Sequence, residues 1–241
     1  MVFMMTSKNY AFSPIATIAT PFKQKFAIPR QPGLAKAKGT ISFLPGFDDI
    51  NMLEGIDGFS HLWLLFIFHQ TQARGWKSKV KAPRLGGNAS TGVLATRSTH
   101  RPNSVGMSVV LNKGIVKHGD SYALTVEGVD LVDGTPIIDI KPYLPYADAI
   151  SGATDKLSSY HPIPQRTVQF DSVLSATLEE LEKQHGDFKS LATSVLSQDP
   201  RPAYKQQCDN DPKTYKVALY NVDLSFIVLG GCVRVTQINP L

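Results

Sequence analysis

Arginine, amide and carboxylate side chains alternate with glycine and proline along residues 83–146. The polar members of this stretch include Arg84, Asn88, Arg97, Arg101, Asn103, Asp130 and Asp133. Glycine and proline set backbone angles that other residues hold only at a cost, so polar groups on these turns indicate a site built from loops on a rigid scaffold. Arginine binds carboxylate or phosphate through its planar fork. We therefore expect a ligand that combines an anionic group with a heterocycle, the alternative being a β domain whose turns are simply polar.

Several other chemistries are excluded by the sequence. No Gly-x-Gly occurs, which excludes the glycine loops of Rossmann folds and kinases, and neither a Walker lysine loop nor a nucleophile elbow is present. His61 and His69 flank an apolar stretch without a third ligand at a suitable spacing, so we expect no metal site. Ser60, His61 and Asp57 could form a hydrolytic triad by residue type, but near neighbours in sequence rarely meet in that geometry.

The distribution of charge indicates an anionic partner. The formal net charge is +5. No Asp or Glu occurs from Gly58 to Gly119, whereas this window holds Arg74, Lys77, Lys79, Lys81, Arg84, Arg97, Arg101, Lys113 and Lys117. An acid-free basic stretch inside a folded domain favours a polyanion, most often nucleic acid. The alternative is a basic face that only keeps the protein in solution.

The sequence favours a cytoplasmic protein without membrane contact. Cys208 and Cys232 are too few for a disulfide framework and lack metal-ligand spacing. The longest apolar run, residues 62–68, is far too short to span a bilayer. The first residues lack the charged and apolar regions of a secretory signal.

Short β-branched and aromatic runs recur between turn signals from Phe12 to Tyr146. We expect strands over residues 14–20, 38–44, 61–70, 91–97, 108–116, 122–132 and 136–144, with a helical turn or two around 48–56. Many short strands at such spacing predict a barrel or a sandwich.

A polar connector at residues 147–166 predicts a boundary, which gives domains at 1–150 and 151–241. Beyond it, apolar residues at helical spacing predict an amphipathic helix broken or kinked near Gly186. These residues are Leu174, Leu178, Leu181, Phe188, Leu191 and Val195. Residues 199–202 end the helix, and residues 215–238 predict a hairpin that turns at Gly230 and Gly231. The second domain is therefore small and α+β.

Five blocks of the chain resemble the bacterial TrmO family of tRNA methyltransferases. They are residues 25–34, 59–71, 83–103, 130–148 and 198–205, and they follow one another in the same order over nearly the whole chain. The resemblance implies an S-adenosylmethionine-dependent enzyme that methylates the exocyclic 6-amino nitrogen of threonylcarbamoyl-adenosine at nucleotide 37 of threonine tRNAs. It also implies a single-sheet β-barrel in place of a Rossmann fold, a smaller C-terminal domain, and a homodimer that binds the anticodon arm.

Family contacts to S-adenosylmethionine, carried onto this sequence, fall on Arg30, Gln31, Pro32, His69, Gln70, Arg97, Met107, Glu127, Gly128, Val129 and Asp130. The chain departs from the family at Ser104 and Val105, where the usual residues are proline and isoleucine. Because a lost proline frees one backbone angle, we expect this loop to be slightly looser. The flanking residues Arg101, Asn103 and Gly106 are intact.

Asp130 and Asp133 are the carboxylates of the strongest block. The accepting nitrogen must lose a proton, which requires an acceptor within hydrogen-bond reach. We expect Asp133 to be this catalytic carboxylate, the alternative being that it only forms a turn with Gly134.

Two alternatives remain open at this stage. The protein could be a non-catalytic RNA-binding platform whose nucleotide-like pocket senses a small molecule. Residues 198–205 could bind tRNA or could only pack the second domain against the first.

Overall fold

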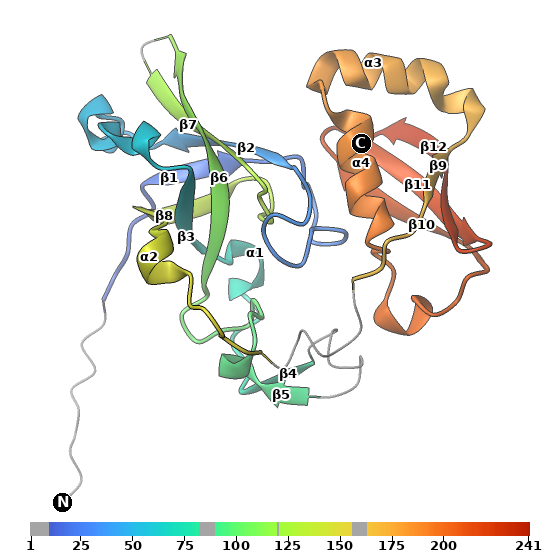
Figure 1. Cartoon of the computed structure of the whole chain (residues 1–241), viewed down its shortest axis with the longest axis horizontal. Helices are drawn as coiled ribbons and strands as arrows, with labels where there is room; N and C mark the ends of the chain where they lie inside the picture. Colours follow the sequence, from blue (N-terminus) through green and yellow to red (C-terminus); the bar gives the residue numbers. More distant parts are fainter. Residues whose placement is uncertain (1–9, 82–89, 120, 156–162) are drawn as a thin grey trace, which may run out of the picture.

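The computed structural model describes residues 10–81, 90–119, 121–155 and 163–241 (Figure 1). Arg84 and Asn88, two of the polar residues expected in the site, lie outside the described residues. The first part of the chain is a closed barrel, and the second is a four-stranded sheet with two helices, α3 and α4 (Figure 1). Within the described ranges, no helix is long and apolar enough to cross a membrane.

Six strands form the barrel in the order β1-β2-β7-β6-β3-β8. Their bounds are β1 Ala16–Ala19, β2 Lys38–Phe43, β3 His61–Ile67, β6 Val105–His118, β7 Ser121–Glu127 and β8 Thr135–Pro142. β8 pairs with β3 on one side and with β1 on the other. In β3 the buried residues Leu62, Leu64 and Phe66 alternate with less buried ones, as a strand with one core-facing side requires. The expectation of a mainly β protein is confirmed.

One end of the barrel carries three connections. Residues 20–37 join β1 to β2, residues 68–104 join β3 to β6, and residues 128–134 join β7 to β8. Every strand is antiparallel to both of its neighbours, so these three connections leave the barrel at the same end. Segments far apart in the sequence therefore meet there.

The connection at residues 68–104 departs from the expected strands. The strand expected over 61–70 ends at Ile67, and the short helix α1 (His69–Gln72) follows it. The Thr71 hydroxyl donates to the Phe68 carbonyl at 3.1 Å, which stabilises this turn over an extended backbone.

The strand expected over 91–97 is also shorter than predicted. Only β5 (Ser90–Gly92) is extended, paired with β4 (Lys79–Lys81), and a 3-10 turn over Val93–Ala95 follows. The Thr96 hydroxyl donates to the Val93 carbonyl at 2.8 Å and closes that turn. The helical turn expected around 48–56 is confirmed by two 3-10 turns, Ile50–Leu53 and Ile56–Gly58.

The second part of the chain is a sheet in the order β10-β11-β12-β9, with β9 parallel to β12. The bounds of its elements and of the helix before it are α2 Pro145–Asp148, β9 Val168–Phe170, α3 Ser175–His185, α4 Phe188–Ser197, β10 Asp211–Leu219, β11 Val222–Leu229 and β12 Cys232–Pro240. Short 3-10 turns span Ser172–Leu174 and Ala203–Lys205.

Glycines end elements of this part where the sequence predicts it. Gly186 has a φ of 70° and separates α3 from α4, which confirms the predicted break. Gly230 and Gly231, with φ of 56° and 74°, form the predicted turn between β11 and β12. A further turn at Tyr220, between β10 and β11, makes the predicted hairpin a three-stranded meander.

A buried charge network fixes the chain after α4. The Arg201 side chain is fully buried and donates to Asp199 through Nε at 2.8 Å and Nη2 at 2.7 Å. Arg166 Nε donates to the same Asp199 carboxylate at 2.7 Å. Burial alone would raise the pKa of Asp199, but the hydrogen bonds and charges of Arg201 and Arg166 outweigh it and hold this pKa below its usual value. Arg201 is therefore a structural residue and does not face RNA.

Replacing Arg201 by methionine keeps the length of the side chain but leaves Asp199 as a buried charge with one partner fewer. We expect Arg201→Met to lower the free energy of unfolding by about 3–5 kcal/mol at pH 7, the usual cost of breaking a buried pair. Because folding lowers the Asp199 pKa, the pair stabilises above the unfolded pKa of about 3.9 and the benefit is lost as pH falls below it. Urea denaturation at pH 7 and at pH 3 measures both effects.

The matched control is Lys216→Met, which removes an exposed ion pair with Asp223 in the same sheet. We expect little change in its denaturation midpoint, since exposed pairs contribute little. Equal midpoints for the two variants would contradict the structural role of Arg201.

Candidate functional site

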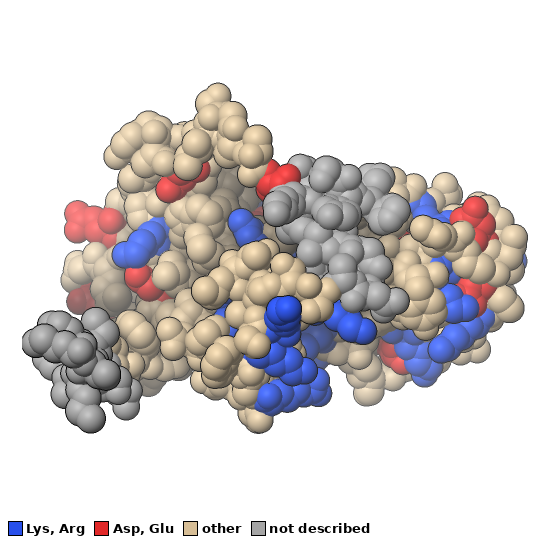
Figure 2. Space-filling model, turned by 90° about the horizontal axis from the view of Figure 1, so that it is seen from below, with Lys and Arg blue, Asp and Glu red and all other residues tan. Residues whose placement is uncertain are grey.

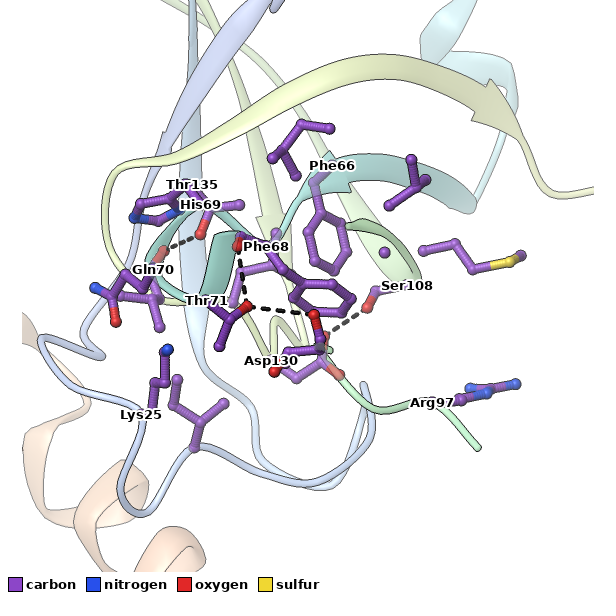
Figure 3. A pocket seen from close by; sticks show the side chains of 18 of the residues that line it. Lys25, Phe66, Phe68, His69, Gln70, Thr71, Arg97, Ser108, Asp130 and Thr135 are labelled. Atoms are coloured by element: carbon purple, nitrogen blue, oxygen red, sulfur yellow. Dashed lines mark hydrogen bonds between the residues drawn. The ribbon is translucent and has the colours of Figure 1, made fainter. Parts of the chain in front are cut away.

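A cavity of about 560 Å³ opens at the end of the barrel that carries the three connections (Figure 3). Residues of all three connections line it, together with the adjoining ends of β3 and β6. Seven of the residues expected to bind the cofactor are among the lining residues, namely Arg30, Gln31, His69, Gln70, Arg97, Met107 and Asp130. The fold thus brings together residues that lie up to 100 positions apart in the sequence.

The wall between these polar groups is aromatic. The rings of Phe66 and Phe68 meet edge to face, with centroids 5.2 Å apart at 84°. Gly106 on β6 leaves the room that they need, because a Cβ atom there would lie 2.4 Å from the Phe66 ring. The cavity therefore presents an apolar, aromatic surface at the level where β3 ends.

Asp130 is the only carboxylate among the described residues that line the cavity. The Ser108 hydroxyl donates to its Oδ1 at 2.6 Å (Figure 3). Burial raises the pKa of Asp130 to about 6, against the opposing effects of the Ser108 hydrogen bond, its own backbone amide and the charge of Arg97. This carboxyl group therefore changes its charge close to neutral pH.

The cations of the cavity have two different roles. Arg101 donates to the backbone carbonyls of Thr96 at 2.6 Å and Val93 at 3.3 Å, and so shapes the loop that carries Arg97. Arg97 donates to the neutral Gln31 side chain at 2.6 Å. No ion pair within the described ranges involves Arg97, so its charge is available to an anionic ligand.

His69, Gln70 and Lys25 lie on the opposite side of the cavity from Arg97 (Figure 3). Thr71 holds the helix that carries His69 and Gln70, because its hydroxyl also lies 3.3 Å from the Thr99 carbonyl. Burial, followed by the charge of Arg74, lowers the pKa of Lys25. The cavity therefore has a cationic group at each side and aromatic rings between them.

Four residues expected to bind the cofactor do not line the cavity. They are Pro32, Glu127, Gly128 and Val129. Gly128 instead belongs to a layer of backbone hydrogen bonds, where the Gly33 amide donates to the Gly128 carbonyl at 2.9 Å and the Gly128 amide donates to the Ala37 carbonyl at 2.8 Å. Gly128 has a φ of 86°, and a Cβ there would lie 3.4 Å from the Gly33 backbone. This layer ties the connection at 20–37 to the connection at 128–134.

Asp133, expected as the catalytic carboxylate, is not among the lining residues either. Its Oδ1 accepts from the Thr20 amide at 2.8 Å, and its Oδ2 pairs with Lys23 at 2.6 Å. Its own amide donates to the Phe22 carbonyl at 2.8 Å. These contacts favour the structural alternative, and the expected turn with Gly134 is present, because the Thr135 amide donates to the Val132 carbonyl at 3.2 Å.

The cavity adjoins an exposed basic surface. Arg74, Lys77, Lys79 and Lys81, which we call the basic surface, are all exposed and lie between α1 and the end of β4. Figure 2 shows Lys and Arg side chains gathered on the lower face of the molecule. Arg84, expected to belong to the same surface, lies outside the described residues. Trp76, within this surface, is 59% exposed.

Lys25 and Ser108 are cavity residues that the sequence does not single out. Ser108 has a weak signal, since it is a polar residue, 2% exposed, at a core-facing position of β6 next to Val110. Lys25 opens the block at residues 25–34, but no feature of its local sequence distinguishes it from a surface lysine. Among the described residues, no group of three or more His, Cys, Asp or Glu side chains could hold a metal ion.

Comparison with known proteins identifies the family. Residues 17–149 match the family model of the tRNA-methyltransferase O N-terminal domain, and residues 163–241 match that of the TrmO C-terminal domain. A tRNA (adenine(37)-N6)-methyltransferase of Escherichia coli K12 is 42% identical over 233 residues, which cover 96% of this chain and 99% of that protein.

A protein of Pseudomonas aeruginosa, named as a candidate S-adenosylmethionine-dependent methyltransferase, is 43% identical over 90% of this chain and 91% of its own length. A crystal structure of TrmO from P. aeruginosa superposes with a TM-score of 0.79 at 37% identity, and the match covers 98% of this chain and all of that one. Both halves of the sequence and the fold agree, and the chain belongs to the tRNA-methyltransferase O family.

Proposed function

We propose that this protein is a tRNA methyltransferase that uses S-adenosylmethionine to methylate the 6-amino nitrogen of adenosine 37. The observation that carries the proposal is the cavity at the barrel end, which combines aromatic rings, one carboxylate and cationic side chains beside an exposed basic surface. Its volume of about 560 Å³ lies in the range of small-molecule sites. The names of the relatives support the same activity.

The cations of the cavity fit the carboxylate of the cofactor. S-adenosylmethionine carries a carboxylate, and Arg97, with Arg30 on the same cavity, would hold it through the guanidinium fork. The rings of Phe66 and Phe68 would cover apolar surface of the ligand. Met107 is 51% exposed at the cavity and would add to this contact.

The residues of the chain have to position the acceptor and accept a proton. The bound cofactor supplies an electrophilic methyl group, so orientation of the accepting nitrogen provides much of the acceleration. This nitrogen is a weak nucleophile because its lone pair is delocalised into the purine ring. Asp130 faces the cavity with a pKa of about 6, which suits a general base near neutral pH. We therefore assign the proton acceptor to Asp130 in place of Asp133.

The substrate that we propose is threonylcarbamoyl-adenosine in threonine tRNAs. Its substituent on the 6-amino nitrogen ends in a carboxylate. Arg97 and Lys25 lie on opposite sides of the cavity, so the carboxylate of the cofactor can face one of them and the carboxylate of the substrate the other. Lys25, opposite Arg97, would face the carboxylate of the substrate (Figure 3).

We further propose a cofactor-binding domain at residues 1–150, a C-terminal domain at 151–241, and a cytoplasmic homodimer that contacts the anticodon arm. The boundary is supported by the gap between α2, which ends at Asp148, and β9, which begins at Val168. Of residues 198–205, Tyr204 is 79% exposed and is available to RNA, whereas Arg201 is buried.

The activity is tested by methyl transfer from labelled S-adenosylmethionine to threonine tRNA, followed by nucleoside mass spectrometry. We expect the label on the 6-amino nitrogen of nucleotide 37, and far less transfer to the same tRNA lacking the threonylcarbamoyl group. Cofactor binding without any transfer would instead support the alternative of a non-catalytic RNA-binding protein.

Asp130→Asn keeps the shape of the side chain but removes the proton acceptor. We expect single-turnover methylation to slow by about 10²-fold, the usual contribution of a positioned base. In the wild type the rate should rise with pH as Asp130 loses its proton and level off above its pKa of about 6, whereas the variant should show no such step. Rapid-quench assays from pH 5 to pH 8 measure both.

Cofactor affinity and the Asp133→Asn variant distinguish the possible roles. If Asp130 only binds the cofactor, Asp130→Asn will weaken cofactor affinity by the same factor by which it lowers the rate at subsaturating cofactor. Saturating cofactor will then restore the wild-type rate. Asp133→Asn should lose stability through the Lys23 contact but keep the rate. A slow Asp133 variant of normal stability would return the catalytic role to Asp133.

The basic surface predicts a salt-dependent tRNA complex. We expect the triple variant Lys77→Ala, Lys79→Ala, Lys81→Ala to bind tRNA more weakly. The slope of log affinity against log salt should fall in magnitude by about 0.7–0.9 for each lost phosphate contact. Filter binding between 50 and 200 mM salt measures the slope, with cofactor affinity as the control that should not change. An unaltered slope would show that these lysines only face solvent.

A further inference from the structure

The connection at residues 20–37 is held from outside by the second half of the chain. Gln198 Nε2 donates to the Leu34 carbonyl at 3.0 Å, and the Ser194 hydroxyl lies 3.4 Å from the same oxygen. Ser194 belongs to α4, and Gln198 is the residue that caps its C-terminal end. Two side chains on one helix end therefore converge on a single backbone oxygen of the barrel.

Leu34 lies three residues after Gln31, the last residue of its connection that lines the cavity. Arg30 and Gln31 line the cavity, and Gln31 accepts the hydrogen bond from Arg97 at 2.6 Å. Gly33, next to Leu34, donates to the Gly128 carbonyl two residues before Asp130. We call residues 30–34 the cofactor loop. Its far end is thus fixed on one side by the barrel and on the other by Gln198.

The amide of Gln198 is itself held in place. Its nitrogen also donates to the Ser194 carbonyl at 2.9 Å, so both of its hydrogens have acceptors. The next residue is Asp199, which has a positive φ of 48° and a side chain fully buried against Arg201 and Arg166. A donor fixed in this way can define the position of the oxygen that it binds.

We propose that Gln198 is a positioning residue through which the second half of the chain sets the affinity of the cavity for S-adenosylmethionine. The inference rests on the proposed function, since it concerns the same cavity. Gln198 does not line that cavity and acts by holding Leu34. Loss of its hydrogen bond allows the cofactor loop to move away from the geometry in which Arg30 and Gln31 face the ligand.

Gln198→Leu, with similar volume and no donor, tests the proposal in the full-length chain. One net hydrogen bond corresponds to about 2-fold to 10-fold in affinity, so we expect calorimetry to give a dissociation constant for S-adenosylmethionine raised by this factor. KM for the cofactor should rise with kcat nearly unchanged. Gln198→Glu, which replaces the donor with an acceptor at constant size, should have at least the same effect and provides a second variant if Gln198→Leu does not fold.

The matched control is Lys38→Gln. It removes the ion pair between Lys38 and Asp187, at 2.9 Å, which joins the same two halves without touching Leu34. We expect its cofactor affinity to equal that of the wild type. An equal loss in the Lys38 variant would overturn the proposal, because general loosening between the halves would then explain the effect.

Hydrogen exchange on the cofactor-free chain provides a readout that does not depend on the proposed function. Peptides covering residues 30–35 should exchange faster in Gln198→Leu and Gln198→Glu than in the wild type and in Lys38→Gln. If the wild type binds no S-adenosylmethionine but the variants differ in exchange as expected, the proposed function is refuted. The positioning of the loop by Gln198 is then still supported. Unchanged exchange in both Gln198 variants, or unchanged affinity where the wild type binds, overturns the inference.

Discussion

The pairing of β8 with both β1 and β3 is the interaction on which the rest of the structure depends. Without the pairing of β8 with β1 the sheet would be open, and these two strands would be its separate edges. With the sheet closed, the first and last strands of the barrel are neighbours, and antiparallel pairing sends three connections to one end. Closure also removes edge strands that could pair with other chains.

The closed end allows residues with irregular backbone to form a site. The strands fix where each connection starts and ends. The polar groups of the connections can therefore form hydrogen bonds with one another. Asp133 bonds to Thr20 and Lys23, and Gly33 bonds to Gly128. Within the connection at 68–104, the Thr71 hydroxyl donates to the Thr99 carbonyl. The cavity is the space that these contacts leave above Phe66 and Phe68. A substitution that loosens them would therefore act on ligand binding before it acted on the barrel.

The sequence predicts the periodic parts of this protein better than the places where periodicity ends. The strand that begins at His61 and the break at Gly186 follow from local chemistry and are confirmed. The ends of strands are set by contacts that no local pattern encodes, such as the threonine hydroxyls that turn the chain after Ile67 and after Gly92. The turn at Tyr220 is hidden for a related reason, since a non-glycine residue there adopts a φ of 53° while its amide donates to Pro21 of the other half.

The candidate site shows the same limit. The family resemblance gives seven of the lining residues, six of them within the five blocks and Met107 between two blocks. The blocks do not separate Asp130 from Asp133, which differ by three positions and carry the same functional group. Only the fold distinguishes them, since Asp130 faces the cavity beside Ser108 whereas Asp133 is paired with Lys23.

Arginine shows most directly how burial and partners decide what a residue type does here. Arg201 is enclosed and neutralised by Asp199 and Asp211, so its charge is used within the protein and makes the chain after α4 rigid. Arg97 has a neutral partner, Gln31, which orients the guanidinium without cancelling its charge. The first arrangement leaves no charge for a ligand, whereas the second leaves a charge that an anionic ligand can neutralise. Gln198 lies between the two, one residue from the rigid network and in contact with the loop that carries Gln31. The charge network of the second half of the chain can therefore help to orient Arg97 in the first half, through Gln198 and the loop that carries Gln31.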